Sequence, residues 1–137
     1  MYLLDTTALI DLIERLPRVL ARFGQSLPGT VFASVISQGE VMIGLRLAHR
    51  LRPDGLTSEV ERAADLLDSL IILPVTSTIA SAYATIQADL MSRGKARLRI
   101  NDGWIAATAL EHHLTLVTSD THLKSLADML RVEDWRE

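Results

Sequence analysis

The chain has 137 residues, a formal charge of −3 and 48% apolar residues. This length suits one domain over residues 1–137, which can bury about two-thirds of its unfolded surface in a single core. The balance of 14 basic and 17 acidic residues excludes a uniformly basic protein that coats nucleic acid, but it is compatible with local basic patches. Cysteine is absent, which excludes disulfides and thiolate metal sites, and no apolar run approaches the ~20 residues of a membrane helix. We therefore expect a soluble, cytoplasmic protein.

The chain begins with a strand, a carboxylate and a helix. Apolar residues 2–4 predict a strand that ends at Asp5. The hydroxyls of the Thr6-Thr7 pair are placed to cap a helix over residues 8–16. Within that helix we expect Asp11 to lie on the solvated side.

A second carboxylate follows the next predicted strand. Residues 30–33 are β-branched and aromatic and predict a strand, and Glu40 lies in the helical segment after it. Ser37 and Glu40 have the spacing of a capping box, in which the glutamate binds the backbone at the helix start. Local sequence leaves two interpretations open for Glu40, a helix cap and a member of a functional site.

The middle of the chain alternates helices and strands. A Pro-Asp-Gly turn at 53–55 separates two helical segments that we expect to form an antiparallel hairpin. Residues 70–73 predict a buried strand, and the hydroxyl residues 76–78 then cap a helix that runs to about residue 91. This alternation predicts a parallel sheet covered by helices on both faces.

The most basic window of the chain is residues 93–99, which contains Lys95, Arg97 and Arg99. Such a loop is either a solvated connection or a surface that contacts phosphate groups. Its position directly before Asp102 makes phosphate contact a hypothesis worth testing.

Two further carboxylates lie near the chain's end. Asn101 or Asp102 can cap the Ala-rich helix that follows. Residues 115–118 predict a buried strand with Asp120 at its carboxyl end, where Asp120 can also cap a helix over 121–129. Residues 130–132 predict an edge strand.

In open parallel sheets, ligands bind at the carboxyl ends of the strands, and all four acids are expected at that edge: Asp5, Glu40, Asp102 and Asp120. Converging carboxylates repel one another unless a cation neutralises them. Their hard oxygens favour Mg²⁺ or Mn²⁺, which can activate water for phosphodiester hydrolysis. The hydroxyls of Thr6 and Thr118 can orient that water or act only as caps.

Other chemistries fit the sequence less well. His112 and His113 are adjacent on a helix and point about 100° apart, so they do not form a metal-binding face. We expect all four histidines to be surface residues. The chain contains no nucleophile elbow, P-loop or dinucleotide-binding glycine motif.

The ordered set of motifs resembles the PIN-domain nucleases, and specifically the VapC-like toxins of bacterial toxin–antitoxin pairs. The matching segments cover essentially the whole chain: LLDTTALID at 3–11, SVISQGEVMIGL at 34–45, NDGWIAATAL at 101–110, LVTSD at 116–120 and VEDW at 132–135. Leu123 stands where the family commonly has an aromatic residue, which bears on local packing.

The resemblance implies a three-layer α/β/α PIN-like domain in which Asp5, Glu40, Asp102 and Asp120 hold Mg²⁺ or Mn²⁺. It also implies an endoribonuclease toxin, an RNA substrate, inhibition by a cognate antitoxin laid over a hydrophobic groove, and homodimers. Three alternatives stay open: an inactive PIN scaffold that binds RNA or protein, a PIN nuclease of RNA processing outside a toxin–antitoxin pair, and a receiver-like phosphoacceptor domain. The last would need paired acids after the first strand, and Asp5-Thr6-Thr7 lacks them.

Overall fold

A computed structural model describes residues 1–55 and 57–137 of the chain. Its centre is a five-stranded sheet in the order β3-β2-β1-β4-β5, and every neighbouring pair is parallel. The strands are short: β1 (Tyr2–Leu4), β2 (Val31–Ser34), β3 (Ile71–Leu73), β4 (Thr115–Val117) and β5 (Val132–Glu133). The predicted strands are confirmed to within one residue at each end, except that the edge strand begins at Val132 rather than at residue 130.

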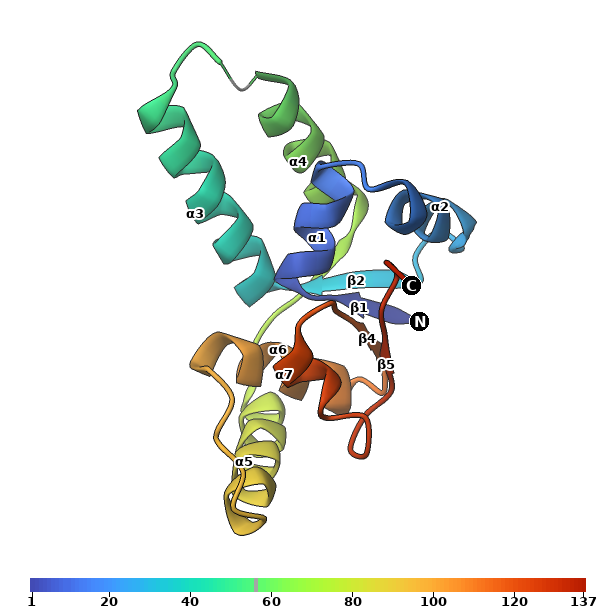
Figure 1. Ribbon diagram of the computed structural model, residues 1–137, viewed down its shortest axis with the longest axis vertical. Helices are drawn as coiled ribbons and strands as arrows, with labels where there is room; N and C mark the ends of the chain where they lie inside the picture. Colours follow the sequence, from blue (N-terminus) through green and yellow to red (C-terminus); the bar gives the residue numbers. More distant parts are fainter. Residues whose placement is uncertain (56) are drawn as a thin grey trace.

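Helices cover both faces of the sheet, which confirms the predicted three-layer α/β/α arrangement (Figure 1). One face carries α1 (Thr6–Ile13), α2 (Pro17–Gln25), α3 (Val35–Leu51) and α4 (Thr57–Ser69). The other carries α5 (Ser77–Ser92), α6 (Ile100–Glu111) and α7 (Thr121–Lys124). Figure 1 shows α3 extending away from the sheet and α4 returning toward it, as expected for a helical hairpin.

Two apolar cores, one on each side of the sheet, hold these layers together. Leu3 and Leu116 face the core under α5 and α6, whereas Leu4 and Val117 face the core under α1. Adjacent strand residues therefore point to opposite sides and are buried on both, as in a sheet covered by two helical layers. No helix within residues 1–55 and 57–137 is long and apolar enough to cross a membrane.

The solvated position predicted for Asp11 is wrong. Asp11 is buried, and its two carboxylate oxygens accept hydrogen bonds of 2.7 Å each from Nε and Nη2 of Arg136. Helical periodicity alone places Asp11 on the outside of α1, but the C-terminal segment covers that side of the helix.

The helix predicted over residues 121–129 is also shorter than expected. Only α7 is helical, and the chain continues in turns where several N–H groups bond to the carbonyl three residues earlier, as from Leu126 to Leu123 and from Met129 to Leu126. These tighter bonds favour turns over a continued α-helix. The N-terminal helix begins at Thr6 rather than at residue 8, because Asp5 rather than the threonine pair is its cap.

Candidate active site

Asp5 lies at the carboxyl end of β1, flanked by the neighbouring strands β2 and β4. Its side chain is buried, with the whole residue 2% exposed. The carboxylate accepts hydrogen bonds from the Ala8 backbone N–H at 2.7 Å and from the Thr7 hydroxyl at 2.8 and 3.0 Å. A further bond comes from the Thr118 hydroxyl, which reaches across from the end of β4. The N-terminus of α1 and the end of β4 thus fix the orientation of this carboxylate.

Burial raises the pKa of Asp5 from 3.8 to about 6, because the ionised carboxylate loses its hydration. The hydrogen bonds from Thr118, Ala8 and Thr7 lower this pKa and offset part of the effect, while the negative charge of Asp102 raises it further. Asp5 is therefore a carboxylate whose ionisation is costly until a positive charge arrives. A cation bound beside it would relieve that cost.

Asp102 and Asp120 form a second pair of interacting acids. Burial raises the pKa of Asp102, and the charge of Asp120 raises it too, whereas Arg99 and His122 lower it. Asp102 is in the first turn of α6, but Arg99 occupies the cap position without a side-chain cap bond, so the predicted capping by Asn101 or Asp102 is wrong. The carboxylate of Asp102 is free of that structural role.

Asp120 does have a structural role. Its Oδ1 accepts hydrogen bonds from the backbone N–H groups of His122 at 2.8 Å and Leu123 at 3.1 Å, which confirms the predicted cap of α7. The second carboxylate oxygen of Asp120, Oδ2, makes no hydrogen bond within the described residues. Capping and membership of an acidic site are compatible at this position.

The capping-box interpretation of Glu40 is wrong. Ser34 caps α3, and its hydroxyl oxygen accepts a 3.0 Å hydrogen bond from the Ser37 backbone N–H. Glu40 Oε1 instead accepts a 3.1 Å bond from the Thr6 hydroxyl at the start of α1. Thr6 directly follows Asp5, so this bond directs Glu40 toward the same edge of the sheet.

Hydroxyl groups connect the ends of β1 and β4. Thr118 donates to Asp5 and also accepts a 3.0 Å bond from the Asp120 backbone N–H. Thr7 accepts bonds from both the backbone N–H and the hydroxyl of Ser119, at 3.3 and 3.2 Å. Sequence reasoning identified Thr6 and Thr118 but treated Thr7 only as a cap, although a hydroxyl two residues after a buried acid was a usable signal. Thr7 holds the carboxylate and the opposite strand together.

The donor set fits a hard divalent cation, since it consists of carboxylate oxygens and includes a buried acid whose pKa is raised. Charge interactions link Asp5 with Asp102 and Asp102 with Asp120, and the Thr6 hydroxyl links Glu40 to the residue that follows Asp5. Across residues 1–55 and 57–137, no three His, Asp or Glu side chains form a ready metal-binding group.

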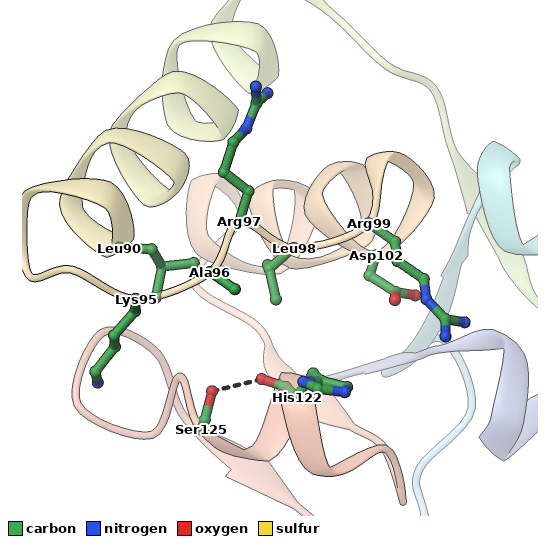
Figure 2. Close-up of a pocket in the computed structure, with 9 residues that line it drawn as sticks. All are labelled: Leu90, Lys95, Ala96, Arg97, Leu98, Arg99, Asp102, His122 and Ser125. Carbon is green, nitrogen blue, oxygen red and sulfur yellow. Dashed lines mark hydrogen bonds between the residues drawn. The ribbon is translucent and has the colours of Figure 1, made fainter.

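A pocket of about 420 Å³ opens beside Asp102 (Figure 2). It is bounded by the loop between α5 and α6 and by α7, and it includes Lys95, Arg99 and His122. Figure 2 shows Arg99 beside Asp102 and Lys95 at the opposite end, whereas the Arg97 guanidinium points away from His122. The predicted basic loop thus contributes Lys95 and Arg99 to the side of the loop that faces α7.

All four histidines are exposed, as predicted. His122 nevertheless lines the pocket, where its charge interacts with Asp102. Sequence reasoning missed this position because no partner at ligand spacing marks it. The contact arises between α6 and α7, which only the fold brings together.

Comparison with known proteins adds independent evidence. The PIN domain family model matches residues 2–129. The chain is 31% identical over 140 residues to Toxin FitB of Neisseria gonorrhoeae, covering all of both chains, and 32% identical over 135 residues to Ribonuclease VapC2 of Haemophilus influenzae, covering 98% of this chain and 97% of the relative.

Solved structures agree with these relatives. The structure of FitAB bound to the IR36 DNA fragment matches with a TM-score of 0.80 and 31% identity, over 100% of this chain and 96% of that one. VapBC-1 from nontypeable Haemophilus influenzae shares the fold, with a TM-score of 0.80 and 24% identity over 99% and 98% of the two chains. The parallel sheet, the acids at its carboxyl edge and these matches together establish that the chain belongs to the PIN-domain family.

Proposed function

We propose that this protein is a metal-dependent endoribonuclease that acts as the toxin of a toxin–antitoxin pair. The observation that carries the proposal is the buried Asp5 carboxylate, whose pKa is raised to about 6, at the carboxyl edge of the sheet and within electrostatic reach of Asp102. The names of the relatives support it, since they include a toxin and ribonucleases that match over almost the full chain.

PIN ribonucleases generally use a divalent metal ion, and we propose Mg²⁺, with Mn²⁺ as a substitute. Asp5, Glu40, Asp102 and Asp120 are the proposed ligands. When bound, such an ion supplies activation of water and stabilisation of negative charge at the phosphate.

The protein's own groups orient the participants. The Thr118 and Thr7 hydroxyls and the Ala8 N–H hold Asp5 in one rotamer, and Thr6 directs Glu40 toward the same edge. Arg99, beside Asp102, provides positive charge for the substrate phosphate. Lys95 extends that charge along the pocket, and Arg97 contributes least because it points away.

We propose a cognate antitoxin as the protein partner, because several structural neighbours are toxin–antitoxin complexes. The apolar face of α3 is the proposed docking surface. Ile43, Leu47 and Leu51 on that helix are 67%, 55% and 73% exposed. A partner segment that covers them would bury apolar area that the isolated chain leaves in water. Homodimers and cytoplasmic action on cellular RNA complete the proposal.

Cleavage of total cellular RNA tests this function. Purified protein, free of antitoxin, is compared with Asp102→Asn in Mg²⁺, in Mn²⁺ and in chelator, and Asp68→Asn on the exposed surface of α4 is the matched control. We expect discrete fragments that carry 5′-phosphates from the unmodified chain and from Asp68→Asn, only with metal, and none from Asp102→Asn.

Two results would contradict the proposal. Cleavage by Asp102→Asn at the unmodified rate would remove Asp102 from the site. Absence of cleavage by every folded variant, together with binding of RNA or of a protein, would favour the alternative of a scaffold without catalytic activity.

A further inference from the structure

The pocket beside Asp102 has a distinct order of chemical groups along its length. Arg99 lies at the end next to Asp102, and Lys95 lies at the other end (Figure 2). The wall between these cations includes the apolar side chains of Leu90, Ala96 and Leu98. The sequence of groups is therefore cation, apolar wall, cation.

An unpaired nucleotide has the complementary order. Its base presents a flat apolar face, and a phosphate precedes and follows the nucleoside along the strand. The pocket volume of about 420 Å³ lies within the ~300–1,000 Å³ range of small-molecule sites. A base in a duplex is stacked and paired, so only a single-stranded or looped segment can present one to such a pocket.

Buried contacts hold the pocket in shape. Gln87 of α5 is 4% exposed, and its amide group makes two hydrogen bonds to the backbone of Leu98: Nε2 donates to the carbonyl at 3.2 Å and Oε1 accepts from the N–H at 3.0 Å. At the other end of the loop, Arg93 pairs with Asp89 and Asp128. The loop is thus attached to α5 by side-chain bonds at both ends.

We propose that this pocket binds one unpaired nucleotide next to the scissile phosphate, with its base against Leu90, Ala96 and Leu98 and its outer phosphate on Lys95. The inference rests on the proposed nuclease function and adds to it a binding site for one base beside Asp102. It separates two contributions: the apolar wall recognises the presence of a base, and Lys95 recognises backbone charge.

Binding of two fluorescent RNA probes tests these contributions separately. One probe is a twelve-nucleotide oligouridylate, and the other is an abasic ribose-phosphate strand of the same length. Affinities are measured by fluorescence anisotropy in Mg²⁺ over a range of salt concentrations. All proteins carry Asp5→Asn to prevent cleavage, since Asp5 is outside the pocket lining.

The unmodified pocket should bind oligouridylate several-fold more tightly than the abasic strand. Ala96→Leu fills the space against the wall and should reduce that ratio to near one without changing the salt dependence. Lys95→Ala should weaken both probes and lower the slope of log K against log salt by about 0.7. Arg50→Ala, which removes an exposed cation on α3 outside the pocket lining, is the matched control and should preserve the ratio.

Equal affinity of the unmodified pocket for both probes would overturn the proposal, as would a preference that survives Ala96→Leu. Cleavage of total RNA distinguishes the two levels of inference. If the protein with Asp5 intact cleaves RNA but the pocket shows no preference for a base, the proposed nucleotide binding is wrong and the proposed nuclease function is supported. If no RNA is cleaved or bound, the proposed function itself is wrong.

Discussion

The Asp5→Asn substitution should stabilise the metal-free protein increasingly as the pH rises. The folded-state pKa of Asp5 is about 6, against an ordinary value of 3.8. Because folding raises this pKa, the folded state binds the proton more tightly than the unfolded state does. The associated stability is fully present below pH 3.8 and is lost as the pH rises toward 6. Asparagine does not ionise, so the variant does not undergo this loss.

The magnitude follows from the difference between the two pKa values. At about 1.4 kcal/mol for each pKa unit, ionised Asp5 costs the folded state about 3 kcal/mol at high pH. Between about pH 4.5 and about pH 7.5, the unfolding free energy of Asp5→Asn should rise by about 2 kcal/mol relative to the unmodified chain. Asparagine also makes poorer hydrogen bonds than the carboxylate does. This loss changes the difference in unfolding free energy between the two proteins by the same amount at every pH, so it does not alter the pH dependence of that difference.

Urea unfolding in chelator across this pH range measures the effect, with Asp68→Asn as the exposed control. Saturating Mg²⁺ should then stabilise the unmodified chain by about 2.7 kcal/mol at 100 times its Kd, and it should stabilise Asp5→Asn much less. The same pH dependence in both proteins would refute the reasoning, because Asp5 would then not be the ionising group. Equal stabilisation by Mg²⁺ would remove Asp5 from the ligand set.

Three further substitutions, with Gly44→Ala as a comparison, test by urea unfolding the packing and hydrogen bonds of α6, β4 and the C-terminal segment. Gly103→Ala should lower the unfolding free energy by about 1–3 kcal/mol, because a Cβ there would lie 2.6 Å from the Tyr83 ring. Gly44 is a helical glycine with open space around it, so Gly44→Ala should raise the unfolding free energy by about 0.5–1 kcal/mol. Equal effects of the two substitutions would contradict the close approach of α5 and α6. Thr118→Val should cost about 1–3 kcal/mol by removing a donor to a buried acid, and a neutral result would show that the bond is not needed. Arg136→Met should cost about 2 kcal/mol by leaving the buried Asp11 carboxylate without its two bonds, and a loss below about 0.5 kcal/mol would contradict that role.

Much of the fold was predictable because its signals are local. Short apolar runs followed by an acid and a helix start identified β1 and β4, and their alternation with helices predicted a parallel sheet. Capping of α7 by Asp120 was likewise predicted from neighbouring residues and is confirmed. The two strands and the cap depend on neighbouring residues, and the parallel sheet follows from the order of strands and helices along the chain.

Two of the errors concern contacts between distant segments. Glu40 had the spacing of a cap, but its hydrogen-bond partner is Thr6, 34 residues away. Asp11 had the periodicity of a surface residue, but Arg136, 125 residues away, covers it. Local sequence carries no signal for either partner, because both pairings follow from how α1 packs on α3 and on the C-terminal segment.

The central position of β1 has a consequence for the protein during its synthesis. β1 precedes β4 along the chain and forms the middle of the sheet, and Asp5 at its end needs the Thr118 hydroxyl, 113 residues later, to complete its hydrogen bonds. A growing chain therefore carries Asp5 long before it has β4 to orient that side chain. The proposed active site is thus assembled only after β4 has been synthesised and has paired with β1.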